Sequence, residues 1–171
     1  LGHIVESVHE DDPTDVLRHA DGIVIGGGNT FRLLEQLERA DLLPRIRARV
    51  KDGMPYIGWS AGANIASPTI MTTNDMPICD PGGFDALALV PFQINPHYVH
   101  GNPPGFKGET REERIREFGV LHPDSWVAGL REGTGFLVED GSIRLLGDAP
   151  CRVFRATQEP RELTSADDFS F

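Results

Sequence analysis

The chain has 171 residues, 39% of them hydrophobic and 25% charged, a composition typical of a folded globular domain with one sizeable core. Its 16 Lys and Arg residues against 26 Asp and Glu residues give a formal net charge of −10, which argues against nucleic acid or an anionic membrane as the main partner. No stretch approaches the roughly 18 apolar residues that a membrane-spanning helix needs.

The first half of the chain predicts alternating strands and helices. Asp12 followed by Pro13 signals a helix start, because aspartate caps the N-terminus and proline suits the first turn. Phe31, Leu34 and Leu37 recur at three-residue spacing, which predicts an amphipathic helix. Uninterrupted apolar runs predict buried strands. The expected elements are a strand over 3–8, a helix over 12–20, a buried strand over 22–25, a helix from about 31, a helix over 43–51 ending at Gly53, and a buried strand over 56–59.

The second half is organised differently. Residues 67–108 are rich in Pro, Gly, Asn and Asp and predict loops around short strands. Thr110 to Glu113 resembles a capping box that opens a helix to about Leu121, and Asp140-Gly141 is a hairpin turn signal. Short strands are expected over 127–130, 136–138, 143–146 and 152–155. Together the elements predict an α/β fold with a mainly parallel sheet flanked by helices and antiparallel strands at its C-terminal end.

The two cysteines, Cys79 and Cys151, lie far apart in the sequence and form no Cys-x-x-Cys motif. A disulfide framework and a thiolate zinc site are therefore disfavoured, and we expect no metal and no organic cofactor. Without a signal-like apolar segment, the cytoplasm is the expected compartment. The chain starts at Leu1 rather than Met, which suggests processing or missing upstream residues.

The strongest local motif is the run from Gly58 to Gly62, Gly-Trp-Ser-Ala-Gly, which matches Gly-x-Ser-x-Gly. It stands between a predicted strand and a predicted helix, the context of a nucleophile elbow, where glycines permit a sharp turn that raises the serine hydroxyl above the sheet. The free N–H groups of the following helix favour developing negative charge. We interpret Ser60 as the candidate nucleophile; the alternative is an ordinary strand-to-helix turn of small residues.

A serine nucleophile needs a base and an orienting carboxylate. His97 follows a short apolar strand, which favours it as the base, and His100 in the next loop is the competitor. Glu132 follows a predicted strand and precedes glycines, so it is a candidate acid by position. The other candidate acids by position are Asp75, Asp80, Asp85 and Glu109.

The loop of three glycines at 26–28, followed by Asn29 and Thr30, also lies between a predicted strand and a predicted helix. It matches neither Gly-x-Gly-x-x-Gly nor a Walker A loop. We expect the N–H of Gly28 to form an oxyanion hole with the N–H of Ala61, the residue after the nucleophile. The alternative is a tight turn that needs positive φ.

Longer runs extend these motifs over nearly the whole chain: 25–31 (IGGGNTF), 56–64 (YIGWSAGAN), 72–78 (TTNDMPI), 80–87 (DPGGFDAL), 93–97 (QINPH), 107–111 (KGETR) and 115–117 (IRE). Together they resemble the peptidase E family of α-aspartyl dipeptidases, and the resemblance weakens after about Gly147. The related cyanophycinases share the serine elbow but are not expected to share the wording of 72–78 and 93–97.

The resemblance implies a fold like that of class I glutamine amidotransferases and a serine exopeptidase that removes N-terminal aspartate from dipeptides. In its Ser-His-Glu triad, Ser60 would be the nucleophile, His97 the general base and Glu132 its partner. Asp75 is kept as a supporting or alternative acid. The resemblance also points to Arg111 as the group that reads the aspartyl carboxylate, a task that suits a bidentate guanidinium.

Two features depart from the family. Arg131 precedes Glu132 where a proline is typical, and family members carry additional N-terminal residues that form the first strand–helix units. The resemblance therefore implies a single α/β serine peptidase domain over 1–171 that is N-terminally incomplete. The alternatives are a cyanophycinase-like hydrolase of β-aspartyl peptides and a truncated, catalytically silent fragment. The expected partners are a small Asp-Xaa peptide and, as a further candidate, a second copy in a homodimer, with no nucleic acid and no membrane.

Overall fold

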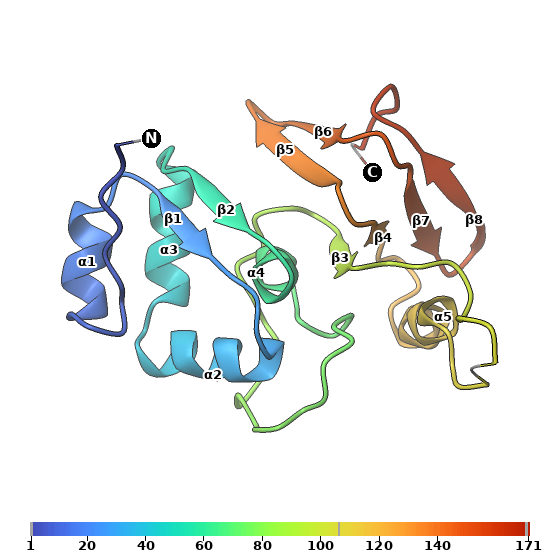
Figure 1. Ribbon diagram of the computed structural model, residues 1–171, viewed down its shortest axis with the longest axis horizontal. Helices are drawn as coiled ribbons and strands as arrows, with labels where there is room; N and C mark the ends of the chain where they lie inside the picture. The colour runs from blue at the N-terminus through green and yellow to red at the C-terminus, as the bar shows by residue number, and fades with distance from the viewer. Residues whose placement is uncertain (1, 106, 170) are drawn as a thin grey trace.

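The computed structural model describes residues 2–105, 107–169 and 171, and it confirms the α/β class (Figure 1). No helix in these residues is long and apolar enough to cross a membrane. The elements, in chain order, are α1 (Pro13–His19), β1 (Ile23–Ile25), α2 (Thr30–Arg39), α3 (Leu43–Lys51), β2 (Tyr56–Gly58), α4 (Ala61–Ala66), β3 (Gln93–Pro96), α5 (Arg111–Leu121), β4 (Val127–Leu130), β5 (Gly135–Glu139), β6 (Ser142–Leu146), β7 (Cys151–Arg155) and β8 (Gln158–Leu163).

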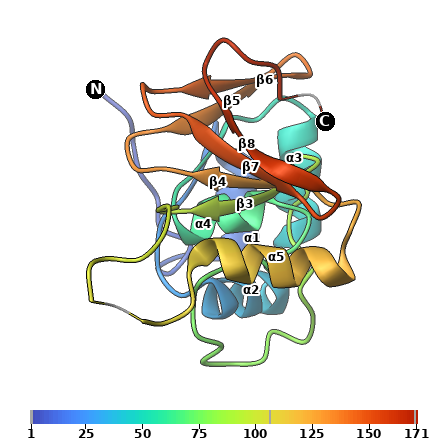
Figure 2. The same cartoon turned by 90° about the vertical axis from the view of Figure 1, so that its right-hand side faces the viewer.

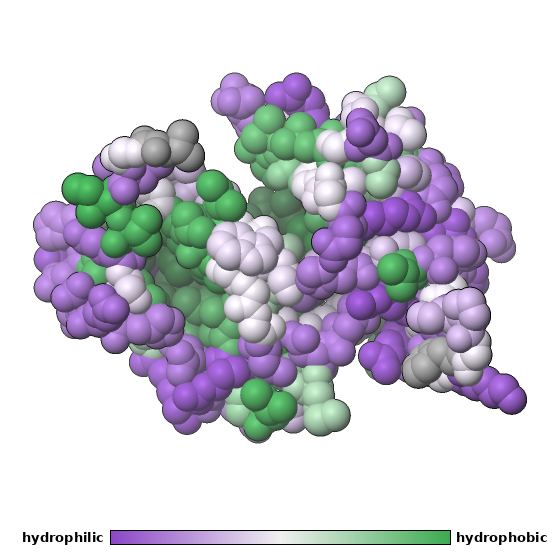
Figure 3. All heavy atoms as spheres, viewed as in Figure 1, coloured by the Kyte–Doolittle hydropathy of each residue, from purple (hydrophilic) through white to green (hydrophobic). Residues whose placement is uncertain are grey.

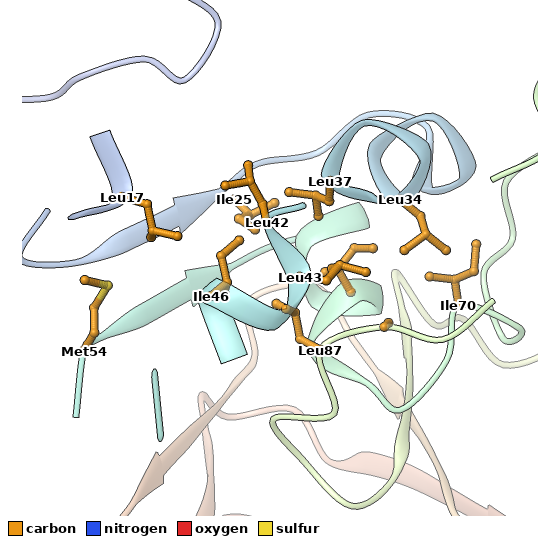
Figure 4. Packing of buried hydrophobic residues seen from close by; sticks show 12 residues of the cluster. Leu17, Ile25, Leu34, Leu37, Leu42, Leu43, Ile46, Met54, Ile70 and Leu87 are labelled. Carbon is orange, nitrogen blue, oxygen red and sulfur yellow. The ribbon is translucent and has the colours of Figure 1, made fainter. Parts of the chain in front are cut away.

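The first half packs helices around the parallel pair β1 and β2. The carboxylate of Asp12 accepts hydrogen bonds from the backbone N–H groups of Thr14 and Asp15, so α1 begins where the sequence predicts. Figure 4 shows the apolar side chains of the helices pointing into one shared cluster. This cluster comprises Leu17, Ile25, Leu34, Leu37, Leu42, Leu43, Ile46, Met54, Ile65, Ile70, Ala86 and Leu87.

The second half is a four-stranded sheet of order β3-β4-β7-β8 with the hairpin β5–β6 beside it. Strands β3 and β4 are parallel, whereas the later pairs are antiparallel, as expected for the C-terminal end. Figure 2 shows α5 against this sheet and the hairpin on its other side. The hairpin turns at Asp140 and Gly141, whose φ angles of 50° and 76° fit the predicted turn.

Helix α4 lies between the two halves, and all six of its residues are buried. Ile65 belongs to the core of the first half and Ala63 to the core of the second, which also contains Phe92 and Val153. Since Ser60 directly precedes α4, the candidate nucleophile stands at the junction of the two halves.

Two expectations about the elements were wrong, and one strand was not predicted. Residues 3–8 form no strand; a strand needs a hydrogen-bonding neighbour, and none of the described strands pairs with this run, where Ile4 is 90% exposed. Strands β1 and β2 are not fully buried, because Val24 and Ile57, paired across the two strands, are 63% and 59% exposed. Figure 3 shows apolar surface on both sides of the hollow between the halves. Strand β8 was not predicted: it is a polar edge strand that contains Pro160, so its hydrophobic pattern is weak.

Candidate active site

Ser60 sits on a sharp turn between β2 and α4 with φ 56° and ψ −116°. A non-glycine residue in this region of backbone space costs about 1–3 kcal/mol, so the surroundings must enforce it. Glycines allow the close packing: a Cβ on Gly62 would overlap the carbonyl oxygen of Ile25, and one on Gly58 would lie 2.6 Å from the Gly62 oxygen. That same oxygen accepts a hydrogen bond of 2.7 Å from the hydroxyl of Tyr56. The turn has the geometry that a nucleophile elbow needs.

The loop of three glycines lies directly beside this serine. A Cβ built on Gly27 would stand 3.3 Å from Ser60 Cβ and 3.5 Å from its Oγ, so a side chain there would crowd the hydroxyl. Gly28 follows with φ 141°, in the region that favours glycine. Ala61 is the first residue of α4, immediately after the serine. The sequence pointed to Gly28 for its N–H, and Gly27 is an additional residue of the site, since a glycine run alone does not show which member lies nearest the hydroxyl.

His97 and Glu132 meet at the carboxyl ends of neighbouring parallel strands. The register pairs Pro96 of β3 with Leu130 of β4, so the residues that follow these strands come to the same edge. His97 Nδ1 hydrogen-bonds to Glu132 Oε1. His97 has φ 56°, and the side chains of His97 and Glu132 are 48% and 78% exposed. Among the described residues, His97 makes its side-chain hydrogen bond to Glu132 and none to Ser60.

The competing histidine, His100, lies 3.5 Å from a carboxylate oxygen of Glu112, whereas Glu132 pairs with His97. Of the other candidate acids, Asp80 accepts the N–H of Gly82, and Glu109 pairs with Arg114 at 2.8 Å. Asp85 is joined to Thr69 by an isolated β-bridge. The geometry thus brings one candidate base and one candidate acid together.

Asp75 occupies a different place, at the N-terminus of α2. Its Oδ2 accepts hydrogen bonds from Thr30 N at 2.7 Å and from Thr30 Oγ1 at 2.6 Å. Thr73 donates to the same hydroxyl of Thr30 at 3.1 Å, and Asn29 donates to the carbonyl of Met76 at 2.8 Å. These bonds tie the loop that carries Asp75 to the end of the glycine loop, and none of them reaches His97.

Arg111 is the first residue of α5, after the capping box of Thr110 and Glu113 that the sequence predicts. It is half-buried, and its Nη1 has no hydrogen-bond partner in the described structure. Burial and the like charge of Arg114 lower the pKa of Arg111, whereas the negative charges of Asp75 and Glu132 act to raise it. Arg111 is therefore a cation within the field of both carboxylates, with an unpaired buried donor.

Two other basic residues that could read a substrate carboxylate, Arg131 and Lys107, are placed differently. Arg131 forms an ion pair with Glu162 at 2.7 Å, and Lys107 is exposed. In residues 2–105, 107–169 and 171, no three His, Cys, Asp or Glu side chains gather closely enough to hold a metal ion.

The chain is similar to known peptidases. The model of peptidase family S51 matches residues 3–146. A protein named Peptidase E from Nostoc sp. is 50% identical over 99% of this chain and 68% of its own length, and one from Salmonella paratyphi A is 50% identical over 99% and 74%.

Among solved structures, the crystal structure of a peptidase from an acI-B1 Actinobacterium has a TM-score of 0.67 and 21% sequence identity. The match covers 94% of this chain and 64% of that chain, so our chain spans less than two thirds of the solved one. At this identity the likeness concerns the fold alone.

Proposed function

Because this chain belongs to peptidase family S51, we propose that it is a serine exopeptidase that hydrolyses dipeptides with an N-terminal aspartate. The observation that carries the proposal is the strained turn at Ser60, with φ 56°, beside the glycine loop. Strain at a non-glycine residue persists only where packing enforces it, and such residues cluster at active sites. The cytoplasm is part of the same proposal, since the resemblance to peptidase E implies it.

In the proposed reaction, Ser60 Oγ attacks the α-carbonyl carbon of the N-terminal aspartate. His97 Nε2 takes the serine proton and later gives it to the leaving amine. Glu132, bonded to His97 Nδ1, holds the ring in the required tautomer and stabilises the imidazolium. The N–H groups of Gly28 and Ala61 would bind the oxyanion, and a water molecule then releases aspartate from the acyl-enzyme.

Arg111 would read the side-chain carboxylate of the substrate aspartate. A buried guanidinium nitrogen without a partner is costly to leave unpaired, and an incoming carboxylate would satisfy it. Asp75 and Glu132 face this cation in the free enzyme, so they partly offset its charge until substrate binds. We also propose that Asp75 holds the end of the glycine loop in place through its hydrogen bonds with Thr30.

The proposal is tested by a matched panel of α-Asp-Leu, β-Asp-Arg and Ala-Leu dipeptides with the wild-type chain and Ser60→Ala. We expect hydrolysis of α-Asp-Leu alone, and a loss of about 10⁴-fold or more in kcat for Ser60→Ala. Binding of α-Asp-Leu to Ser60→Ala should persist, which would separate the chemical step from recognition.

Preferential hydrolysis of β-Asp-Arg would replace the proposal with a cyanophycinase-like activity. A folded wild-type chain that binds α-Asp-Leu and turns over none of the three would be a silent binder. Activity retained by Ser60→Ala would remove the serine from the mechanism.

A further inference from the structure

The carboxylate of Glu132 meets His97 although its side chain is exposed to solvent. Its side chain is 78% exposed, so packing does not fix the carboxylate that meets His97. A solvated glutamate loses considerable side-chain freedom when it is held in one geometry. The constraint must come from the backbone turn that carries it, residues 131–134.

The turn is closed by its own hydrogen bonds. The carbonyl of Arg131 accepts from Thr134 N at 3.2 Å and from Thr134 Oγ1 at 2.6 Å. Gly133 has φ 74°, and Gly147 passes so close that a Cβ on it would overlap the Gly133 carbonyl. These contacts shape the turn, and β4, which the turn directly follows, brings it to the edge of the sheet.

The side chain of Arg131 adds a second attachment of the turn to the sheet, at β8. Its Nη1 donates to Glu162 Oε2 at 2.7 Å and its Nη2 to Glu162 Oε1 at 2.9 Å, a two-pronged bond to β8. Nη1 also donates to the carbonyl of Pro150. The guanidinium lies 5.5 Å from the ring centre of Tyr98, the residue after His97. One side chain thus contacts β8 and the neighbour of the candidate base.

Glu162 is itself part of a longer charged chain. It accepts from Arg152 Nη1 at 3.2 Å, and Arg152 Nε donates to Glu112 Oε2 at 3.2 Å. Hydrogen bonds from Arg131 hold the pKa of Glu162 below its ordinary value, which fits an ionised pair. The side chains of Arg131 and Arg152 are only 22% and 19% exposed, so these charges are less screened by solvent than surface pairs.

We propose that Arg131 is a positioning residue for the proposed hydrolysis: its two-pronged bond to Glu162 sets the turn so that Glu132 meets His97. Arg131 touches no substrate in this role and acts through its neighbour. The measurement of turnover rests on the proposed function. The two arms of the test therefore separate the proposed dipeptidase activity from the positioning role of Arg131.

The first arm measures kcat and KM for α-Asp-Leu, with thermal unfolding, in Arg131→Met, Glu162→Gln and the double variant. We expect each single variant to lose about 10- to 30-fold in kcat with KM within about two-fold, because a misplaced Glu132 weakens the transition state and not binding. The kcat of the double variant should be no lower than that of the less active single variant, because the two substitutions break the same bond. The control is Arg144→Met, which removes an exposed arginine 3.7 Å from Glu139 on the β5–β6 hairpin and should leave kcat unchanged.

The second arm follows covalent labelling by a fluorophosphonate, in which the serine oxygen displaces fluoride from phosphorus and the base accepts the serine proton. This reaction does not depend on peptide specificity. Labelling of the wild-type chain should be about 10-fold faster than that of Arg131→Met, and equal to that of Arg144→Met.

If folded Arg131→Met keeps wild-type kcat and labelling rate, the positioning role is wrong. A rise in KM alone would make Arg131 a substrate-binding cation and would also overturn it. If the wild-type chain cleaves no aspartyl dipeptide, the proposed function fails, and the labelling rates still decide the role of Arg131.

Discussion

Ser60 and Glu132 are carried by different elements, the β2–α4 turn and the turn after β4, and different forces hold them. Ser60 is fixed by backbone contacts at α4, a helix in which every residue is buried. Glu132 is 78% exposed and depends on a turn that ion pairs attach to the sheet. Steric contacts between backbones are insensitive to salt, whereas ion pairs weaken with screening. The turn at Ser60 is therefore the rigid part of the site, and the turn at Glu132 is the part that high salt can loosen.

Gly62→Ala and Gly133→Ala test the difference in rigidity between the two turns, and they should have the largest effects. An alanine Cβ at position 62 overlaps the Ile25 carbonyl, whereas at position 133 no atom lies within 4 Å and only the φ of 74° opposes it. We expect Gly62→Ala to lower the free energy of unfolding by more than about 3 kcal/mol, and Gly133→Ala by about 1 kcal/mol. Denaturant unfolding of both variants measures this, and equal losses would mean that the elbow is not the rigid side.

Glu132→Gln and Asp75→Asn separate the two candidate acids. Loss of the Glu132 charge beside His97 should lower kcat about 100- to 1,000-fold with little change in KM, because the imidazolium forms only during the reaction. Asp75 hydrogen-bonds to Thr30 and not to His97, so Asp75→Asn should lower kcat less and should also raise KM. Steady-state kinetics on α-Asp-Leu decide the order, and the reverse order of kcat losses would transfer the triad role to Asp75.

Arg111→Met tests whether Arg111 binds the side-chain carboxylate of the substrate. Removal of the cation should lower kcat/KM for α-Asp-Leu about 30- to 300-fold, the worth of one charge-assisted contact. Selectivity for α-Asp-Leu over Asn-Leu should fall with it, while the reactivity of Ser60 stays. An unchanged Asp/Asn ratio in kcat/KM would show that another group reads the carboxylate.

Much of this arrangement could be predicted from the sequence, because it depends on local signals. The cap at Asp12, the capping box at Thr110 and the turn at Asp140 each act within a few residues, and each was found where the sequence placed it. The sharp turn at Ser60 could likewise be predicted from its glycines and flanking elements.

The rest could not be predicted, because it depends on contacts between distant parts of the chain. Nothing local to Arg131 shows that it meets Glu162, and the strand that carries Glu162 has no apolar alternation. The role of Asp75 at the N-terminus of α2 depends on a contact with Thr30, 45 positions away. The exposure of Val24 and Ile57 was hidden as well, since an apolar run does not show which of its faces is covered.

The proposed mechanism requires Ser60 to be a nucleophile that His97 activates. The most direct test is intact mass and peptide mapping after treatment with a fluorophosphonate, for the wild-type chain, Ser60→Ala and His97→Ala. We expect one adduct per wild-type chain, located on Ser60, none in Ser60→Ala, and labelling of His97→Ala slower by about 100-fold or more. An adduct on another residue, or equal labelling of the wild-type chain and Ser60→Ala, would contradict it.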